Sequence, residues 1–91
     1  MKNTYDGIIK GNNFKVITTY TEKYYDDDSG NYDVYTTTTV YKNGDFWGSH
    51  NKSKTNSRVV KSENYKLTTG NELNFHEVVN AILNPYFDAG F

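Results

Sequence analysis

The sequence contains no cysteine, which excludes disulfide bonds, thiolate chemistry and cysteine-ligated zinc sites. Its longest aliphatic runs are pairs, such as Ile8-Ile9 and Val78-Val79, whereas a membrane-spanning helix needs roughly 20 apolar residues. The first ten residues also lack the apolar run of an export signal. We therefore expect a soluble, cytoplasmic protein that makes no contact with a membrane.

Aliphatic side chains are scarce as well, because Val, Ile, Leu and Phe make up only 19 of the 91 residues. This composition approaches that of disordered chains, but the net charge of −1 supplies none of the repulsion that accompanies disorder. Nine Tyr, five Phe and one Trp are available to fill a core instead. The chain is long enough for one domain, so we expect a single aromatic-rich domain over residues 1–91.

A two-residue period dominates the first two thirds of the chain. Residues 14–24 and 32–42 are rich in β-branched and aromatic types that alternate between two faces, and turn-forming residues separate the two runs. Asn43-Gly44 then tolerates the positive φ angles of a two-residue type I′ hairpin turn. The remaining predictions are a strand from Asp45 to about Ser49, a solvated loop at 51–57, a strand at 58–67 and a short strand at 5–10.

The C-terminal segment changes to the helical period. Apolar residues recur there at the spacing of one helix face: Phe75, Val78, Val79, Ile82 and Leu83. Asn74 is predicted to cap the amino end of this helix, with Glu77 completing a capping box. Because Pro85 disfavours helical geometry at the residue before it, the helix is predicted to end at Asn84.

A helix of about ten residues is too short to be stable alone, so its apolar stripe should dock on the sheet. The predicted fold is therefore α+β, with a four- or five-stranded antiparallel sheet and one C-terminal helix packed on one face. Three aromatic residues after the proline, Tyr86, Phe87 and Phe91, are expected to return over the edge of the core. The other sheet face should be exposed and rich in Tyr and Thr, a surface suited to a protein partner or a homodimer.

The acidic run at residues 26–33 suggests calcium, because hard cations bind several carboxylate oxygens of one short loop. With the glycine in the sixth position of an EF-type loop, however, Tyr25 and Thr36 occupy the two positions that require carboxylates. The two histidines, His50 and His76, are too few for a zinc site. We expect no metal, no cofactor and no enzymatic activity, because no convergent catalytic set is recognisable.

The same acidic run is a candidate interaction surface. Consecutive aspartates at a hairpin end, with tyrosines on the flanking strands, offer a protein partner both charge and contact area. The predicted partner-binding residues are Asp26, Asp27, Asp28, Asp33, Tyr24, Tyr25 and Tyr35. The basic groove of a nucleic-acid-handling complex would accept these carboxylates in place of phosphates.

Residues 42–66 have the opposite charge, with six basic residues against two acidic ones. Phosphates need cations and bases need flat rings to stack on, so the alternative function is that of a single-stranded nucleic-acid-binding domain. The residues concerned are Lys42, Trp47, Lys52, Lys54, Arg58 and Lys61. The isoelectric point near 6.0 and the absence of an RNP-like run favour protein binding over this alternative.

The run Thr36–Thr39 and the threonines at 18, 19 and 21 also suggest a regular hydroxyl array. Ice-binding surfaces use such arrays, and carbohydrate binding is a related interpretation. Ordinary β-propensity, however, explains these threonines equally well. The array therefore ranks below both functions above.

In overall character the chain resembles the accessory proteins of phages and mobile elements from AT-rich genomes, which are small, rich in Asn, Lys and Tyr, free of cysteine and built as one domain. Inhibitors of host defence complexes, such as anti-CRISPR proteins, are among them. The resemblance covers the whole chain but depends on no motif, so it transfers no site residues. It implies a non-catalytic inhibitor that binds a host complex in the cytoplasm of the host cell.

Overall fold

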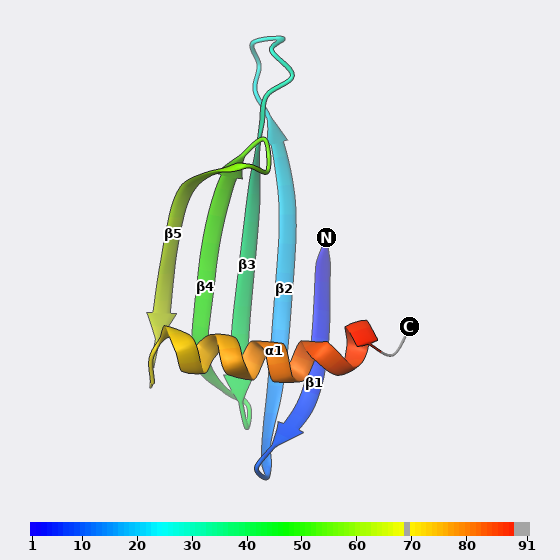
Figure 1. Ribbon diagram of the computed structural model, residues 1–91, viewed down its shortest axis with the longest axis vertical. Helices are drawn as coiled ribbons and strands as arrows, with labels where there is room; N and C mark the ends of the chain where they lie inside the picture. The colour runs from blue at the N-terminus through cyan, green and yellow to red at the C-terminus, as the bar shows by residue number, and fades with distance from the viewer. Residues whose placement is uncertain (69, 89–91) are drawn as a thin grey trace.

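The computed structural model describes residues 1–68 and 70–88, and side chains among them as far as residue 86. Five antiparallel strands form one sheet in chain order: β1 (Lys2–Ile9), β2 (Asn12–Tyr24), β3 (Tyr32–Lys42), β4 (Asp45–Thr55) and β5 (Val59–Leu67). The helix α1 (Glu72–Asp88) crosses one face of this sheet (Figure 1). The predicted α+β fold is thus confirmed.

Tight turns keep the strands in this order. Lys10-Gly11 and Asn43-Gly44 have positive φ at both positions, as two-residue type I′ turns require, which confirms the prediction for Asn43-Gly44. Asn43 also bonds the turn region to β2, because its Oδ1 accepts a hydrogen bond from the backbone N–H of Asn13 at 2.9 Å. Its own N–H donates to the carbonyl oxygen of Asn13 at 2.7 Å. The turn therefore connects the β3–β4 hairpin to β2.

Strand β4 is longer than predicted, so the predicted loop at 51–57 is wrong for residues 51–55 and correct only for 56 and 57, which lie in the turn before β5. Residues 51–55 pair with β3 on one side and with β5 on the other, so neighbouring strands satisfy their backbone groups. Their side chains bond across the strands, since Asn51 Nδ2 donates to Asn64 Oδ1 at 3.1 Å and Ser53 Oγ lies 2.6 Å from Ser62 Oγ. The polarity that suggested a loop instead belongs to half-buried or buried strand residues, in a part of the sheet that α1 leaves uncovered, whose side chains bond one another across the strands.

The helix begins three residues earlier than predicted. Asn71 caps it, with Oδ1 accepting a hydrogen bond from the N–H of Asn74 at 2.9 Å and its carbonyl oxygen accepting one from Phe75 at 3.0 Å. The predicted cap at Asn74 is wrong because the earlier asparagine allows one more turn, with the acidic Glu72 in the first turn. A negative charge there is favourable next to the helix dipole.

The helix also continues through Pro85, although proline removes one backbone hydrogen bond. The added turn brings Tyr86 onto Tyr5 of β1, with ring centroids 4.9 Å apart. Tyr86 Oη donates a hydrogen bond to the carbonyl oxygen of Asp6 at 2.9 Å. These contacts offset the cost of the proline, so the predicted end before it is wrong. The side chain of Phe87 and all of Phe91 lie outside the described residues.

The core lies between α1 and the sheet face that it covers. Its buried residues are Phe14, Val16, Val40, Phe75, Val79 and Ile82. Two glycines let the helix approach closely, because a Cβ on Gly7 would lie 2.5 Å from Ile82 Cδ1 and one on Gly48 would lie 3.1 Å from Phe75 Cδ2. The helix therefore docks through the predicted stripe, over the half of the sheet farther from the β2–β3 loop (Figure 1).

Candidate functional site

The β2–β3 hairpin extends beyond the rest of the sheet (Figure 1). Strands β2 and β3 have 13 and 11 residues, whereas the edge strands β1 and β5 have 8 and 9. Past the last strand pair, Tyr24 with Tyr32, the N–H of Tyr25 still donates to the carbonyl oxygen of Asn31 at 2.9 Å. Because α1 crosses the other end of the sheet, it leaves this hairpin end uncovered (Figure 1).

The loop at the tip carries three consecutive aspartates, Asp26, Asp27 and Asp28, and all three are exposed. Asp27 Oδ1 accepts hydrogen bonds from the hydroxyl and the N–H of Ser29, and these bonds lower the pKa of Asp27. Asp28 and Gly30 have positive φ angles that reverse the chain. The tip therefore presents a concentrated negative charge in a loop that its own hydrogen bonds shape.

Asp33 differs from these aspartates because its side chain is buried, with the residue only 4% exposed. Its carboxylate accepts hydrogen bonds from Lys61 Nζ at 2.8 Å, Tyr25 Oη at 2.9 Å and Thr55 Oγ1 at 3.2 Å. The bond from Lys61 is the main cause of the lowered pKa of Asp33, and the same bond raises the pKa of Lys61. Asp33 thus links the end of the β2–β3 hairpin, through Tyr25, to β4 and β5.

Exposed tyrosines surround this buried carboxylate. Tyr24, Tyr25 and Tyr35 are 60%, 38% and 41% exposed. They line a hollow of about 550 Å³ together with Lys23, Asp26, Asp27, Asp33 and Lys61, which we call the hairpin hollow. The structure therefore brings six of the seven predicted partner-binding residues to one place, and Asp28 lies beside them in the loop.

The helix-side face of the same hairpin also has tyrosines, and Tyr24 is one of them. Tyr20 and Tyr24 both donate hydrogen bonds to Glu22, at 2.6 and 3.3 Å. The bond to Glu22 raises the pKa of Tyr20 to about 12, and the negative charge of Glu22 raises the pKa of Tyr24. Tyr24 also packs against Tyr32, with ring centroids 5.1 Å apart. Both faces of the hairpin end are thus aromatic, and the raised pKa values keep the phenols of Tyr20 and Tyr24 neutral at physiological pH.

The predicted nucleic-acid-binding residues do not share one surface. Lys52 and Lys54 are opposite even-numbered residues of β3 and lie on the helix-side face, whereas Lys61 reaches the buried carboxylate on the other face. Arg58 lies in the turn after β4, and Lys42 lies at the far end of β3. The cations are therefore distributed around the sheet.

Trp47, the ring expected to stack on bases, packs in the core instead. A register shift after Val40 leaves Trp47 without a direct partner on β3. Its ring stacks on Phe75 with centroids 6.1 Å apart and meets Phe14 edge-on at 5.7 Å. The half-buried Trp47 therefore stabilises the contact between sheet and helix.

Both histidines lie where α1 meets β4 and β5, a proximity that the sequence did not predict. The rings of His50 and His76 have centroids 5.4 Å apart, and Tyr65 stacks on His50 at 4.3 Å. Tyr65 Oη lies 2.7 Å from His76 Nε2, and His50 Nε2 lies 2.9 Å from Glu63 Oε2, a contact that lowers the pKa of Glu63. Within the described residues, no group of three or more His, Asp or Glu is arranged to hold a metal.

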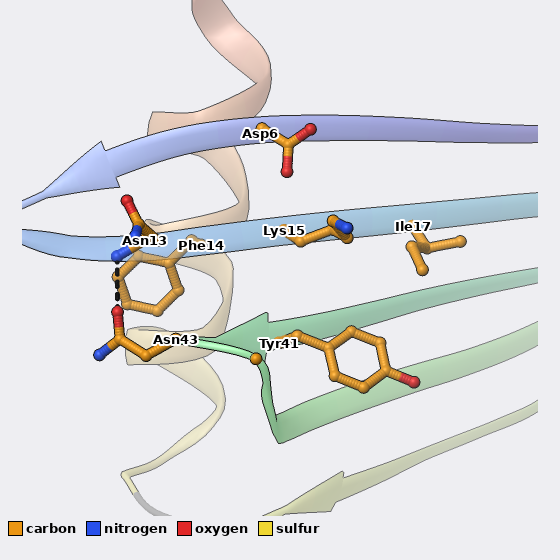
Figure 2. A pocket seen from close by; sticks show the side chains of 8 residues that line it. Asp6, Asn13, Phe14, Lys15, Ile17, Tyr41 and Asn43 are labelled. Atoms are coloured by element: carbon orange, nitrogen blue, oxygen red, sulfur yellow. Dashed lines mark hydrogen bonds between the residues drawn. The ribbon is translucent and has the colours of Figure 1, made fainter.

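A second hollow, of about 640 Å³, lies at the other end of the sheet on the face that α1 leaves bare (Figure 2). Its lining residues are Asp6, Asn13, Phe14, Lys15, Ile17, Tyr41, Asn43 and Gly44. The sequence did not predict this site because the residues come from three strands and a turn, and only the strand register brings them together.

Comparison with known proteins identifies no relative: no family model, curated protein or solved structure matches the chain. No helix among residues 1–68 and 70–88 is long and apolar enough to cross a membrane. An inference about function therefore depends on the geometry of the two hollows and the hairpin end.

Proposed function

We propose that the protein is a non-catalytic protein-binding module that contacts its partner with the end of the β2–β3 hairpin. The observation that supports this proposal is the hairpin hollow, where exposed Tyr24, Tyr25 and Tyr35 lie beside the aspartates of the loop. Tyrosine supplies a large contact area at a low cost in conformational entropy. Protein interfaces also concentrate their affinity in a few such rings.

The hydrogen bonds to Asp33 hold two tyrosine rings of this surface in position before a partner binds. Tyr25 donates to its carboxylate at 2.9 Å and Tyr35 at 3.4 Å, so two of the three exposed rings are held by the same buried group. Rings that are already positioned lose less conformational freedom when a partner binds. Asp33 therefore acts by positioning the tyrosines, while the exposed aspartates of the tip meet the partner.

The charge of the tip favours a partner with a basic groove. Three adjacent carboxylates attract such a groove and select against acidic surfaces. A groove that normally holds nucleic-acid phosphates has the required charge. We propose accordingly that the protein inhibits a nucleic-acid-handling complex of a host defence system, as an accessory protein of a phage or mobile element, in the anti-CRISPR manner.

The test begins with a partner recovered from host-cell lysate by affinity capture and then purified. Calorimetry compares its affinity for the parent with its affinity for Tyr24→Thr and Tyr35→Thr, which retain β-propensity and remove the rings. Each change should weaken binding at least about tenfold, as expected for an interface hot spot. Equal affinity of both variants and the parent would refute the proposal.

Ile8→Thr is the matched control for these variants. Ile8 is another exposed apolar side chain, 71% exposed, on edge strand β1, away from the hairpin end. Its replacement should leave the affinity for the partner unchanged. An equal loss in all three variants would place the interface outside the hairpin end.

A further inference from the structure

The second hollow brings together residues of three neighbouring strands. The register places Asp6 of β1 opposite Lys15 of β2, and Lys15 opposite Tyr41 of β3. Figure 2 shows these side chains, with Ile17, on the side of the sheet away from the helix. The hollow thus has a row of one carboxylate, one ammonium group and one aromatic ring, with an aliphatic side chain beside it.

The charged groups of this row have no partner among the residues that the structure describes. Although Asp6 and Lys15 are directly opposite, neither side chain forms a hydrogen bond or an ion pair with any described residue. Elsewhere on the bare face polar side chains bond one another, as Thr37 Oγ1 does to Asn51 Oδ1 at 2.9 Å. The hollow therefore keeps donors and acceptors available for a ligand.

Tyr41 forms an apolar platform next to these groups. Phe46 supports it from β4, with ring centroids 6.2 Å apart and the ring planes at 80°. Figure 2 shows the Tyr41 ring lying along the sheet surface, with Ile17 nearby on β2. An aromatic ring has a negative face, which attracts the weakly positive C–H groups of a sugar ring.

From this combination we infer that the second hollow binds a neutral saccharide. One sugar ring stacks on Tyr41, while Asp6 accepts hydrogen bonds from its hydroxyls and Lys15 donates to its oxygens. One carboxylate and one ammonium cancel in charge, so the hollow has no net charge with which to select an ion. Its volume of about 640 Å³ accommodates a small oligosaccharide.

The threonine run 36–39 is not part of the proposed saccharide site. Thr37 and Thr39 lie on the bare face, whereas Thr36 and Thr38 pair with Lys52 and His50 on the helix-side face. Adjacent residues of a strand point to opposite faces, so four consecutive threonines cannot form one array. The saccharide site is instead the mixed row at the far end of the same sheet.

A titration followed by ¹H–¹⁵N NMR tests the inference with three neutral probes: maltotriose, cellotriose and triacetylchitotriose. At least one should cause saturable shifts centred on the amides of Lys15, Ile17 and Tyr41. Asp6→Asn and Lys15→Gln change exposed side chains and should each weaken this binding severalfold, and Tyr41→Leu should weaken it at least about tenfold.

Lys2→Gln is the control, because Lys2 lies on the same face of β1 as Asp6 and does not line the hollow. It should bind like the parent. The inference is overturned if none of the three saccharides shifts these amides, if the shifts centre elsewhere, or if Asp6→Asn and Lys15→Gln bind as well as Lys2→Gln. A response to zwitterionic L-phenylalanine alone would also overturn it, because the site would then select charge.

Discussion

The two ends of the sheet are held together by different interactions. Under α1 the buried groups are apolar, and Val16 and Val40 have no exposed surface. At the hairpin end Val34 and Ser53 are buried too, but the carboxylate of Asp33 is the buried charged group. It accepts hydrogen bonds from Tyr25 after β2 and from one residue each of β3, β4 and β5. Burial of apolar surface is non-directional, whereas charge-assisted hydrogen bonds fix positions. The larger share of the stability therefore comes from the end under α1, whereas the hydrogen bonds of Asp33 fix the geometry of the hairpin end and add a smaller share.

The largest loss of unfolding free energy is expected for a substitution on the buried face of the helix. Ile82 is 2% exposed, so Ile82→Ala should lose about 2–5 kcal/mol of unfolding free energy, measured by urea denaturation. Leu73→Ala is the matched control, because Leu73 is 72% exposed in the same helix and its loss should stay within about 0.5 kcal/mol. An unchanged midpoint for Ile82→Ala would show that the stripe does not face the sheet.

The next largest loss of stability is expected where the helix and the sheet approach each other closely. A Cβ at Gly48 would lie 2.9 Å from Leu67 Cδ2 and 3.1 Å from Phe75 Cδ2, so Gly48→Ala should cost about 1–3 kcal/mol through overpacking. Because Leu67 is the nearest obstacle, combining this change with Leu67→Ala should cost less than the sum of the two single changes. Strict additivity in thermal unfolding would contradict the packing described.

A smaller loss is expected at the β3–β4 turn. Gly44 has a φ of 88°, which a β-branched residue adopts only with strain, so Gly44→Val should cost more than about 1 kcal/mol. Gly44→Asn should cost less, because asparagine tolerates positive φ. If both variants melt within a degree of the parent, the turn does not determine the register.

At the hairpin end we expect a contribution to the unfolding free energy that depends on pH. The pKa of Asp33 is lower in the folded protein than in the unfolded chain, so its stabilising effect is complete above about pH 4 and lost as the pH falls through the folded pKa. Asp33→Asn should therefore destabilise the protein at pH 7, and the difference from the parent should shrink towards pH 2. Urea midpoints across this range provide the measurement.

Asp26→Asn, a change in the exposed loop, is the control for that experiment. Part of the acid dependence should remain in Asp33→Asn, because the pKa values of Asp27 and Glu63 are also lowered by their hydrogen bonds. A constant difference between Asp33→Asn and the parent at all pH values would show that the charge of Asp33 does not stabilise the fold.

The fold was predictable where a local pattern decides the structure. Alternation in β2 and β3, the positive φ angles of Asn43-Gly44 and the helix stripe that includes Phe75 and Ile82 are short-range signals. Residues 51–55 gave no such signal, because they are strand only through pairing on both sides. Pro85 was misread for the same reason, since the contact of the next residue with β1 is long-range.

The candidate sites, too, were predictable from the sequence only where their residues belong to one local element. The tyrosines and aspartates of the hairpin hollow were found together because they belong to one hairpin, a local element. Local alternation did not predict the internal role of Asp33, because its partner Lys61 lies on β5, at a register shift. The row of Asp6, Lys15 and Tyr41 was missed entirely, because it exists only once β1, β2 and β3 are in register.

The central claim is that the acidic hairpin end contacts the partner while the covered half of the sheet provides stability. The most direct measurement is the rate of association with the purified partner, at low and moderate salt, for the parent and for a variant with Asp26, Asp27 and Asp28 changed to Asn. Lys52, Lys54 and Arg58 changed to Gln form the reciprocal control.

We expect the Asp-to-Asn variant to fold like the parent, with at most the small loss of stability that follows from the hydrogen bonds of Asp27, but to associate more slowly at low salt and with a weaker salt dependence, because electrostatic steering acts on association. The Gln control should associate at least as fast as the parent. Equal association rates for the Asp-to-Asn variant and the parent at both salt concentrations would contradict the claim, and loss of binding in the Gln control alone would favour the nucleic-acid alternative.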